Sequence, residues 1–164
     1  MIEKLDHVTM VVRELEKAMV SYKNILQLPP SEIGIVDNSP ECRLVMLPTA
    51  SGARIEFIEP NPDYDSRFSR FLKERGEGVF GLSVFCRNFD EEITRLKAKG
   101  VKVEEEIQAF LYPENPLRLA WIPPDEGHGV WIELVDMETL PDFVVKGLQS
   151  PSISEKKSWK RSGK

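Results

Sequence analysis

The segment Arg43-Leu44-Val45-Met46-Leu47-Pro48 is repeated 75 residues later as Arg118-Leu119-Ala120-Trp121-Ile122-Pro123. Two more pairs of segments follow in the same order. Leu5-Asp6-His7-Val8 aligns with Val79-Phe80-Gly81-Leu82 at an offset of 74, and the residues around Glu56 align with those around Glu133 at an offset of 77. Three matches in one order, with a drift of only a few residues, indicate that the chain contains two copies of one structural unit.

Each copy is predicted to contain a strand, a helix and three more strands. β-Branched and apolar runs predict the strands, and apolar residues at helical spacing predict the helices. In the first copy we predict a helix at 14–26 and strands at 5–12, 31–36, 42–47 and 53–58. In the second copy we predict a helix at 90–99 and strands at 79–86, 101–105, 117–122 and 130–135. A connecting helix is predicted at 66–75, because glycines follow it at the positions where helices usually end.

These elements predict an α+β fold, in which two tandem βαβββ modules form a curved mixed sheet shaped like a cup. The modules are placed at about residues 4–60 and 79–136. The 164 residues are enough for one domain with its own core, which we place at residues 1–137. Residues 138–164 are predicted to form a C-terminal extension that is disordered and basic from about residue 150.

Composition and charge exclude several classes of protein. No apolar run approaches the roughly 18 residues of a membrane span, and 41% hydrophobic with 30% charged residues is typical of a soluble globular protein. The net charge is −5 although the last ten residues carry five basic groups, so the body is acidic and does not suggest nucleic-acid binding. The N-terminus lacks the layout of a secretory signal, so we expect a cytoplasmic protein. Cys42 and Cys86 are expected to be reduced, buried thiols.

One histidine and two glutamates are predicted to share a face of the sheet. Side chains alternate along a strand, and the apolar set must face the helices, so His7, Glu56 and Glu133 face the other way. Ionisable groups on apolar strands are costly to bury unless they are paired or bind a cation. Two carboxylates and one imidazole suit a divalent ion such as Mn²⁺, Co²⁺, Ni²⁺, Fe²⁺ or Zn²⁺. On spacing alone, three polar residues lining a wet cup explain the pattern equally well.

The segments around these residues resemble those of methylmalonyl-CoA epimerases, a branch of the vicinal oxygen chelate (glyoxalase/bleomycin resistance/dioxygenase) superfamily. The similar segments keep their order over about residues 4 to 136; they are Leu5–Val8, Arg54–Pro60, Phe71–Gly78 and Val130–Val135. The resemblance implies a divalent metal ion held by His7, Glu56, Glu133 and a second histidine. This chain has Gly81 at the fourth position. The substitution implies weaker metal binding and argues against the ring-cleaving dioxygenases, which need a His-His-Glu triad.

The resemblance implies a metal-dependent isomerase, epimerase or lyase that acts through an enolate-type intermediate on a small carbonyl or acyl-thioester substrate. Glu133 is then both a metal ligand and a catalytic base, and Glu41 is a second candidate acid or base, unless it is an exposed loop acid. It also implies a homodimer. Two alternatives stay open. One is a non-catalytic small-molecule binding protein that sequesters its ligand, and the other is an accessory subunit that works through the basic tail.

Several other residues have a structural and a functional interpretation. His128 is placed in a turn rather than among the metal ligands. Arg54 can reach an anionic substrate group, as can Arg43 and Arg118, but these last two occupy equivalent repeat positions, which favours a structural role. Aromatic residues on strands are most often core, although three of them can also shape an apolar pocket. They are Phe85, Trp121 and Trp131.

Overall fold

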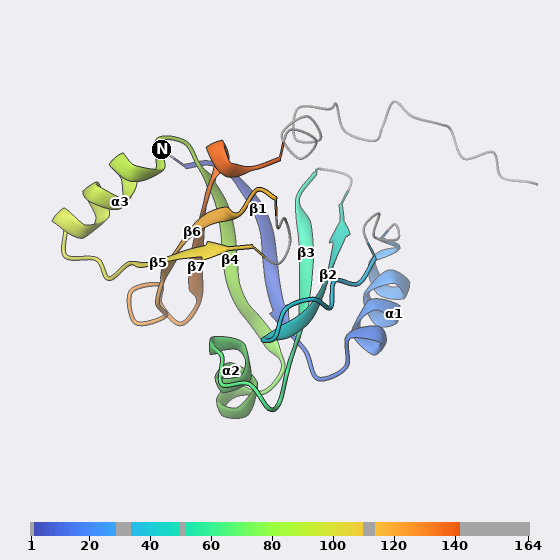
Figure 1. Ribbon diagram of the computed structural model, residues 1–164. Helices are drawn as coiled ribbons and strands as arrows, with labels where there is room; N and C mark the ends of the chain where they lie inside the picture. The colour runs from blue at the N-terminus through green and yellow to red at the C-terminus, as the bar shows by residue number, and fades with distance from the viewer. Residues whose placement is uncertain (1, 29–33, 50–51, 110–113, 142–164) are drawn as a thin grey trace, which may run out of the picture.

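Seven strands form one mixed sheet that curls strongly into a half-barrel (Figure 1). The computed structural model describes residues 2–28, 34–49, 52–109 and 114–141. In chain order the elements are β1 (Ile2–Val11), α1 (Leu15–Leu26), β2 (Cys42–Pro48), β3 (Arg54–Pro60), α2 (Arg67–Arg75), β4 (Gly78–Cys86), α3 (Phe89–Ala98), β5 (Glu104–Gln108), β6 (Leu117–Ile122), β7 (Trp131–Asp136) and the short 3-10 helix η1 (Met137–Thr139). The α+β fold and the curved mixed sheet predicted from the sequence are confirmed.

The two modules join within one chain. The strand order is β2-β3-β1-β4-β7-β6-β5, and the modules meet where β1 pairs antiparallel with β4. In that junction His7 lies opposite Ser83 and Thr9 lies opposite Gly81. Each central strand also pairs in parallel with the last strand of its own module, β1 with β3 and β4 with β7. The register therefore relates the two halves by an approximate twofold axis that passes through the junction, as the sequence repeat requires.

Two predicted strands differ from those observed. For the strand predicted at 31–36, residues 31–33 lie outside the described residues, and Val36 forms only an isolated bridge to Leu44. The strand predicted at 101–105 begins later, at Glu104, because the preceding segment serves the helix before it. The backbone N–H of Val101 donates to the carbonyl of Leu96 at the end of α3, and the Val101 side chain packs under that helix.

The convex face of the sheet is covered by α1 and α3, which lie on opposite flanks (Figure 1). Under α1, the core cluster contains Val12, Leu15 and Phe57, together with other apolar side chains of the first module. Under α3, the matching cluster contains Ile93, Leu134 and their neighbours. Apolar residues that alternate with His7, Glu56 and Glu133 fall in these clusters, so the predicted assignment of faces is confirmed. They are Met10 of β1, Ile55 and Phe57 of β3, and Ile132 and Leu134 of β7.

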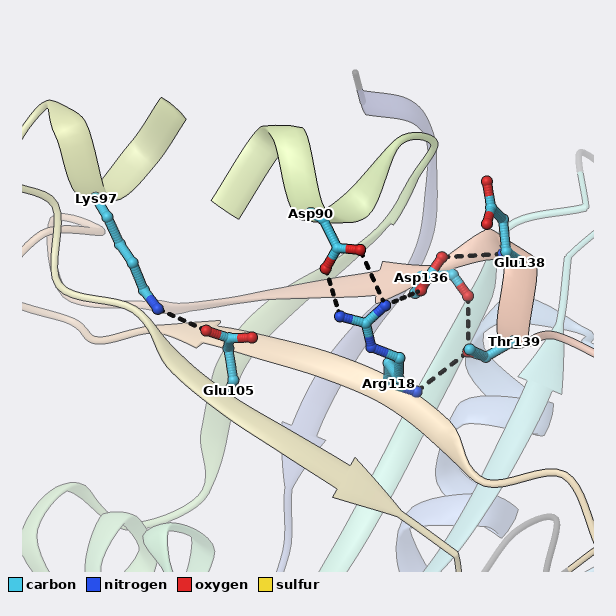
Figure 2. Close-up of polar contacts among 7 residues, drawn as sticks. All are labelled: Asp90, Lys97, Glu105, Arg118, Asp136, Glu138 and Thr139. Atoms are coloured by element: carbon cyan, nitrogen blue, oxygen red, sulfur yellow. Dashed lines mark hydrogen bonds and ion pairs between the residues drawn. The ribbon is translucent and has the colours of Figure 1, made fainter. Parts of the chain in front are cut away.

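Each module carries the same three-residue ion-pair cluster between its helix and its sheet. Arg118 of β6 binds Asp90 of α3 at 2.5 Å and Asp136 of β7 at 3.3 Å (Figure 2). Arg43 of β2 binds Glu16 of α1 and, at 3.3 Å, Glu59 of β3. The acids occupy equivalent places in the repeat, as the two arginines do. These contacts confirm a structural role for Arg43 and Arg118.

The ordered body continues past the last strand. Leu140 is buried in a cluster with Phe85, Leu117 and Val135, and the side chain of Thr139 accepts from the backbone N–H of Arg118 (Figure 2). The basic tail predicted from about residue 150 lies outside the described residues. Cys42 and Cys86 are both buried, as expected, and burial raises the pKa of the Cys42 thiol to about 12. Among the described residues no helix is long and apolar enough to cross a membrane.

We expect Arg118→Met to lower the free energy of unfolding by roughly 1–2 kcal/mol, because it leaves the buried Asp136 carboxylate without its cation. Denaturation in urea measures this loss. Lys17→Met is the matched control, since Lys17 and its partner Glu14 are both exposed and their removal should cost nothing measurable. Equal effects of the two substitutions would contradict a structural role for the cluster.

Candidate functional site

The structure brings His7, Glu56 and Glu133 together on the concave face of the sheet. The Nε2 atom of His7 lies 3.3 Å from Oε2 of Glu56 and 3.5 Å from Oε2 of Glu133. All three residues are buried, with exposed fractions of 5%, 6% and 7%. They come from β1, β3 and β7 of one chain, so this cluster does not need a second subunit.

Asp6 completes the cluster through a β-bulge that alternation along the strand could not predict. Between Leu5 and His7 the register of β1 slips by one residue against β4, which makes Asp6 the extra residue of the bulge. The slip turns Asp6 towards its neighbour, and its Oδ2 lies 2.8 Å from Nδ1 of His7. Arg54 donates to the same oxygen. Arg54 is therefore bound to Asp6 inside the site, although it also lines the adjacent cavity.

The charges of these groups are strongly coupled. Burial by itself lowers the pKa of His7, but the Glu56 carboxylate, the hydrogen bond to Asp6 and the Glu133 carboxylate together raise it to about 10. Burial also raises the pKa of Glu56, and the charge and hydrogen bond of His7 reverse that effect, so its pKa is lowered overall. The described cluster therefore holds an imidazolium beside the ionised carboxylates of Asp6 and Glu56.

Among the carboxylates of the cluster, Glu133 has the least stabilised charged form. Burial raises its pKa to about 7, since the attraction of His7 is opposed by repulsion from Glu56. The two carboxylates also differ in their hydroxyl neighbours. Thr9 donates to Glu56 at 2.8 Å, whereas the equivalent Ser83 lies near enough to Glu133 to favour its charged form but makes no hydrogen bond among the described residues. Glu133 can therefore exchange a proton near neutral pH.

Two small cavities flank the carboxylates. The first, of about 50 Å³, is lined by His7, Glu56, Glu133 and mainly apolar side chains that include Phe85. The second, of about 40 Å³, contains Glu41 and Trp121 as well as Glu56 and Glu133. Glu41 is half-buried; burial and the charge of Glu106 raise its pKa, against the opposing charges of two arginines. The structure thus places Glu41 beside the other site residues rather than on an exposed loop.

Two other candidate residues, His128 and Trp131, take the structural positions that the sequence suggested for them. His128 is in the turn between β6 and β7, with a left-handed backbone, and lines neither of these cavities. Trp131 is stacked on Phe80, with ring centres 5.9 Å apart.

A family model describes residues 6–111 of the chain, and its description is glyoxalase/bleomycin resistance protein/dioxygenase superfamily. The matched segment contains both His7 and Glu56. The chain belongs to this superfamily.

Similar proteins include several superfamily members of known structure. Methylmalonyl-CoA epimerase from Mycobacterium tuberculosis is 26% identical, with a TM-score of 0.68 over 88% of this chain and 93% of that chain. A methylmalonyl-CoA epimerase in complex with methylmalonyl-CoA and NH₄⁺ is 23% identical, with a TM-score of 0.67 over 83% of this chain and 95% of that one, a likeness in fold. The uncharacterized protein YqjC of Bacillus subtilis (strain 168) is 26% identical over 133 residues, which cover 81% of this chain and 91% of that protein.

Gly81, which stands where the resemblance implies a second histidine, is enclosed by the backbone. A Cβ atom at this position would lie 2.6 Å from the carbonyl oxygen of Trp131, which is closer than real Cβ contacts. A second β-bulge explains this approach, because Phe80 is the extra residue on β4 just as Asp6 is on β1. In the second module a stacked Phe80–Trp131 pair therefore stands where the first module has Asp6 and Arg54.

The remaining donors suit a divalent ion of the kind that the superfamily commonly binds. Ligands about 2.1 Å from a common ion at tetrahedral angles lie about 3.4 Å apart, close to the separations between His7 and the two glutamates. Asp6 holds Nδ1 of His7 and so directs Nε2 at the carboxylates, as outer carboxylates do in metal sites. As they stand, the described residues contain no group of three or more His, Cys, Asp or Glu side chains that could hold a metal ion. Binding would therefore require small shifts and loss of the His7 proton.

Gly81→Ala should destabilise the protein by about 1–3 kcal/mol, because the added methyl group collides with the Trp131 carbonyl. For the same reason Gly81→His should fail to improve metal affinity, although it restores the residue typical of the superfamily. Urea denaturation and calorimetric metal titration test the two statements. A stable Gly81→His variant with tighter metal binding would contradict this account of the site.

The ion pairs of His7 should make stability depend on pH in the metal-free protein. Because its pKa rises from 6.5 to about 10 on folding, this stabilisation is complete below pH 6.5 and is lost as the pH rises through 10. We expect the stability advantage of the wild type over His7→Gln to shrink across that range in denaturant titrations. An advantage that is constant between these pH values would show that His7 is neutral in the folded protein.

Proposed function

We propose that this protein is a metal-dependent isomerase, epimerase or lyase that moves a proton on the carbon next to the carbonyl of a small carbonyl or acyl-thioester substrate. The observation that carries the proposal is the convergence of two buried carboxylates and an imidazole, with Glu133 lining both adjacent cavities. A purely structural ion pair has no need for a third charged group or for the cavities beside it. The similarity to methylmalonyl-CoA epimerases supports the same class of reaction.

His7, Glu56 and Glu133 would hold the divalent ion, which is Mn²⁺, Co²⁺, Ni²⁺, Fe²⁺ or Zn²⁺ on the chemistry of its ligands. When bound, such an ion supplies positive charge that stabilises an enolate-type intermediate of the substrate. Asp6 positions His7 through the 2.8 Å contact at Nδ1. Since Glu56 is supported by Thr9 and Glu133 is not supported equivalently, the two carboxylates have different roles.

Glu133 is the proposed base as well as a proposed metal ligand, because its carboxylate lines both cavities beside the cluster. Glu41 is the proposed second acid or base. It reaches the second cavity from the segment just before β2, while Glu133 reaches it from β7, and burial and the charge of Glu106 raise its pKa. Two acids that enter one cavity from different strands can serve the two faces of a planar intermediate, as epimerisation requires.

A binding protein that sequesters a small molecule is the second candidate. The half of the site formed by Phe80, Gly81 and Trp131 is apolar and closed, which favours a sequestration protein. The retained polar half, with its three buried ionisable residues, favours the enzyme. An accessory role for the basic tail, a homodimer and a cytoplasmic location also stay predictions.

Metal titration of the metal-free protein by calorimetry tests the proposed site. We expect at least one of the five ions to bind with a Kd below about 1 mM, and both His7→Ala and Glu133→Ala to abolish that binding. Glu126→Gln serves as the control, because Glu126 is an exposed acid in the turn between β6 and β7. If no ion binds the wild type, the metal-dependent enzyme is excluded and the sequestration protein is favoured.

Exchange of the α-proton tests the proposed chemistry directly. Acyl-CoA thioesters incubated with the metal-loaded protein in deuterated water should lose their α-proton signal in NMR spectra. Glu133→Gln should slow this exchange by at least about 100-fold, which is the contribution expected of a general base. Exchange that continues at the wild-type rate in Glu133→Gln would assign the base to another residue.

A further inference from the structure

The second cavity collects buried polar atoms that the protein itself leaves unpaired. Among the described residues, five buried side-chain atoms have no hydrogen-bond partner, and three of them belong to residues that line this cavity. The three are Arg67 Nη1, Gln108 Oε1 and Trp121 Nε1. Buried polar atoms without a hydrogen-bond partner are rare in folded proteins, and each needs a physical reason. Arg67 and Gln108 have no assigned role in the proposed reaction.

Arg67 is held rigidly at the first helical position of α2. Its guanidinium carbon lies 4.5 Å from the ring centre of Trp121 and 5.3 Å from that of Trp131, so the group lies against both indoles. On one side, Nη2 is paired with Glu106 at 3.1 Å. Nη1 is buried and unpaired. The contacts with the indoles and the ion pair hold the guanidinium in place and leave Nη1 for a ligand.

Trp121, which contacts the guanidinium of Arg67, supplies a second hydrogen-bond donor. Its indole N–H can only donate, and it is buried without an acceptor among the described residues. The nearby carboxylates of Glu56 and Glu133 are directed at His7 instead. Two adjacent N–H donors of this kind, one of them charged, are suited to a negatively charged oxygen.

The charges of the cavity restrict where an anion can bind. Arg67 is the one cationic side chain among the described residues that line it, and the acidic ones are Glu41, Glu56, Glu106 and Glu133. An anionic group elsewhere in the cavity would face carboxylates. Only the edge formed by Arg67 and Trp121 offers an anionic group a favourable position. The charges of the cavity therefore determine where the anion binds as well as attract it.

We propose that Arg67 and Trp121 form an oxyanion subsite that selects substrates bearing a carboxylate group and holds that group through Arg67 Nη1–H and Trp121 Nε1–H. The inference deepens the proposed function, on which its catalytic meaning rests. Since Glu133 lines the same cavity, a carboxylate held at this subsite presents its neighbouring carbon to the proposed base. Arg67 and Trp121 are thus specificity-determining residues and not proton-transfer groups.

A titration of the metal-free, full-length protein tests the subsite separately from metal chemistry. Propionate is the probe, and propionamide, with the same shape and no charge, is its neutral counterpart. We expect propionate to shift the NMR signal of the Trp121 indole N–H, which is identified by its loss in Trp121→Phe, with an affinity in the millimolar range, and we expect propionamide to leave it unchanged. Equal binding of both probes would overturn the inference.

Matched variants separate recognition from a structural role. Arg67→Gln and Trp121→Phe should each weaken propionate binding about tenfold, since each removes one donor, and Trp121→Phe keeps a ring face for Arg67 to stack on. Backbone amide shifts report binding in both variants. Arg70→Gln on the same helix is the control, because Arg70 is exposed and paired with Asp65. Undiminished binding by Trp121→Phe contradicts the subsite even if Arg67→Gln does not fold.

In the metal-loaded protein, the same variants should change selectivity. The ratio of kcat/KM for a carboxylate-bearing acyl thioester to that for its neutral amide analogue should fall about tenfold in Arg67→Gln and partly recover in Arg67→Lys. Propionate binding without metal binding would sustain the subsite while the proposed function fails. Metal binding and α-proton exchange, with a kcat/KM ratio that does not change in the variants, would sustain the proposed function and overturn the subsite.

Discussion

The ion-paired cluster of His7 with Asp6, Glu56 and Glu133 is the interaction on which the rest of the structure depends. Charged groups this deeply buried are stable only if each has a partner in good geometry, because loss of hydration costs several kcal/mol per ion. The partners come from three strands and both modules. The junction of β1 with β4 must therefore keep its register, and the two bulges in that junction set which side chains enter the cup.

The features predicted from sequence are those that follow from periodicity. The repeat of Arg43 and Arg118 predicted two equivalent modules, and strand alternation placed His7, Glu56 and Glu133 on one face. The role of Asp6 was not predicted, because a β-bulge interrupts the alternation of side chains along the strand. A single sequence does not reveal a bulge at that position. The proposed roles of Arg67 and Trp121 depend on a contact between a connecting helix and a distant strand, which spacing along the chain cannot reveal.

The two modules differ in the residues that line the cup, but they share the ion-pair clusters that join helix to sheet. In the first module Arg54 pairs with Asp6, and Asp6 with His7; in the second, the equivalent positions are the stacked Trp131 and Phe80, with Gly81 beside them. The ion-pair clusters of Arg43 and Arg118 are retained in both modules between helix and sheet. The ion pairs between helix and sheet are thus separate from the positions at which the two halves of the cup differ, so that one half can have a different polarity without loss of the fold.

The close approach of the Trp131 carbonyl to Gly81 also restricts which residues position 81 can hold. A histidine at this position cannot be accommodated by one substitution, since its Cβ would meet the backbone of β7 before its imidazole reached the cup. The strand would have to move, and Trp131 is held by its stacking on Phe80 and by the guanidinium of Arg67. A histidine at this position therefore requires several concerted changes in β4 and β7, and single substitutions at position 81 cannot add a fourth ligand to the three-residue cluster.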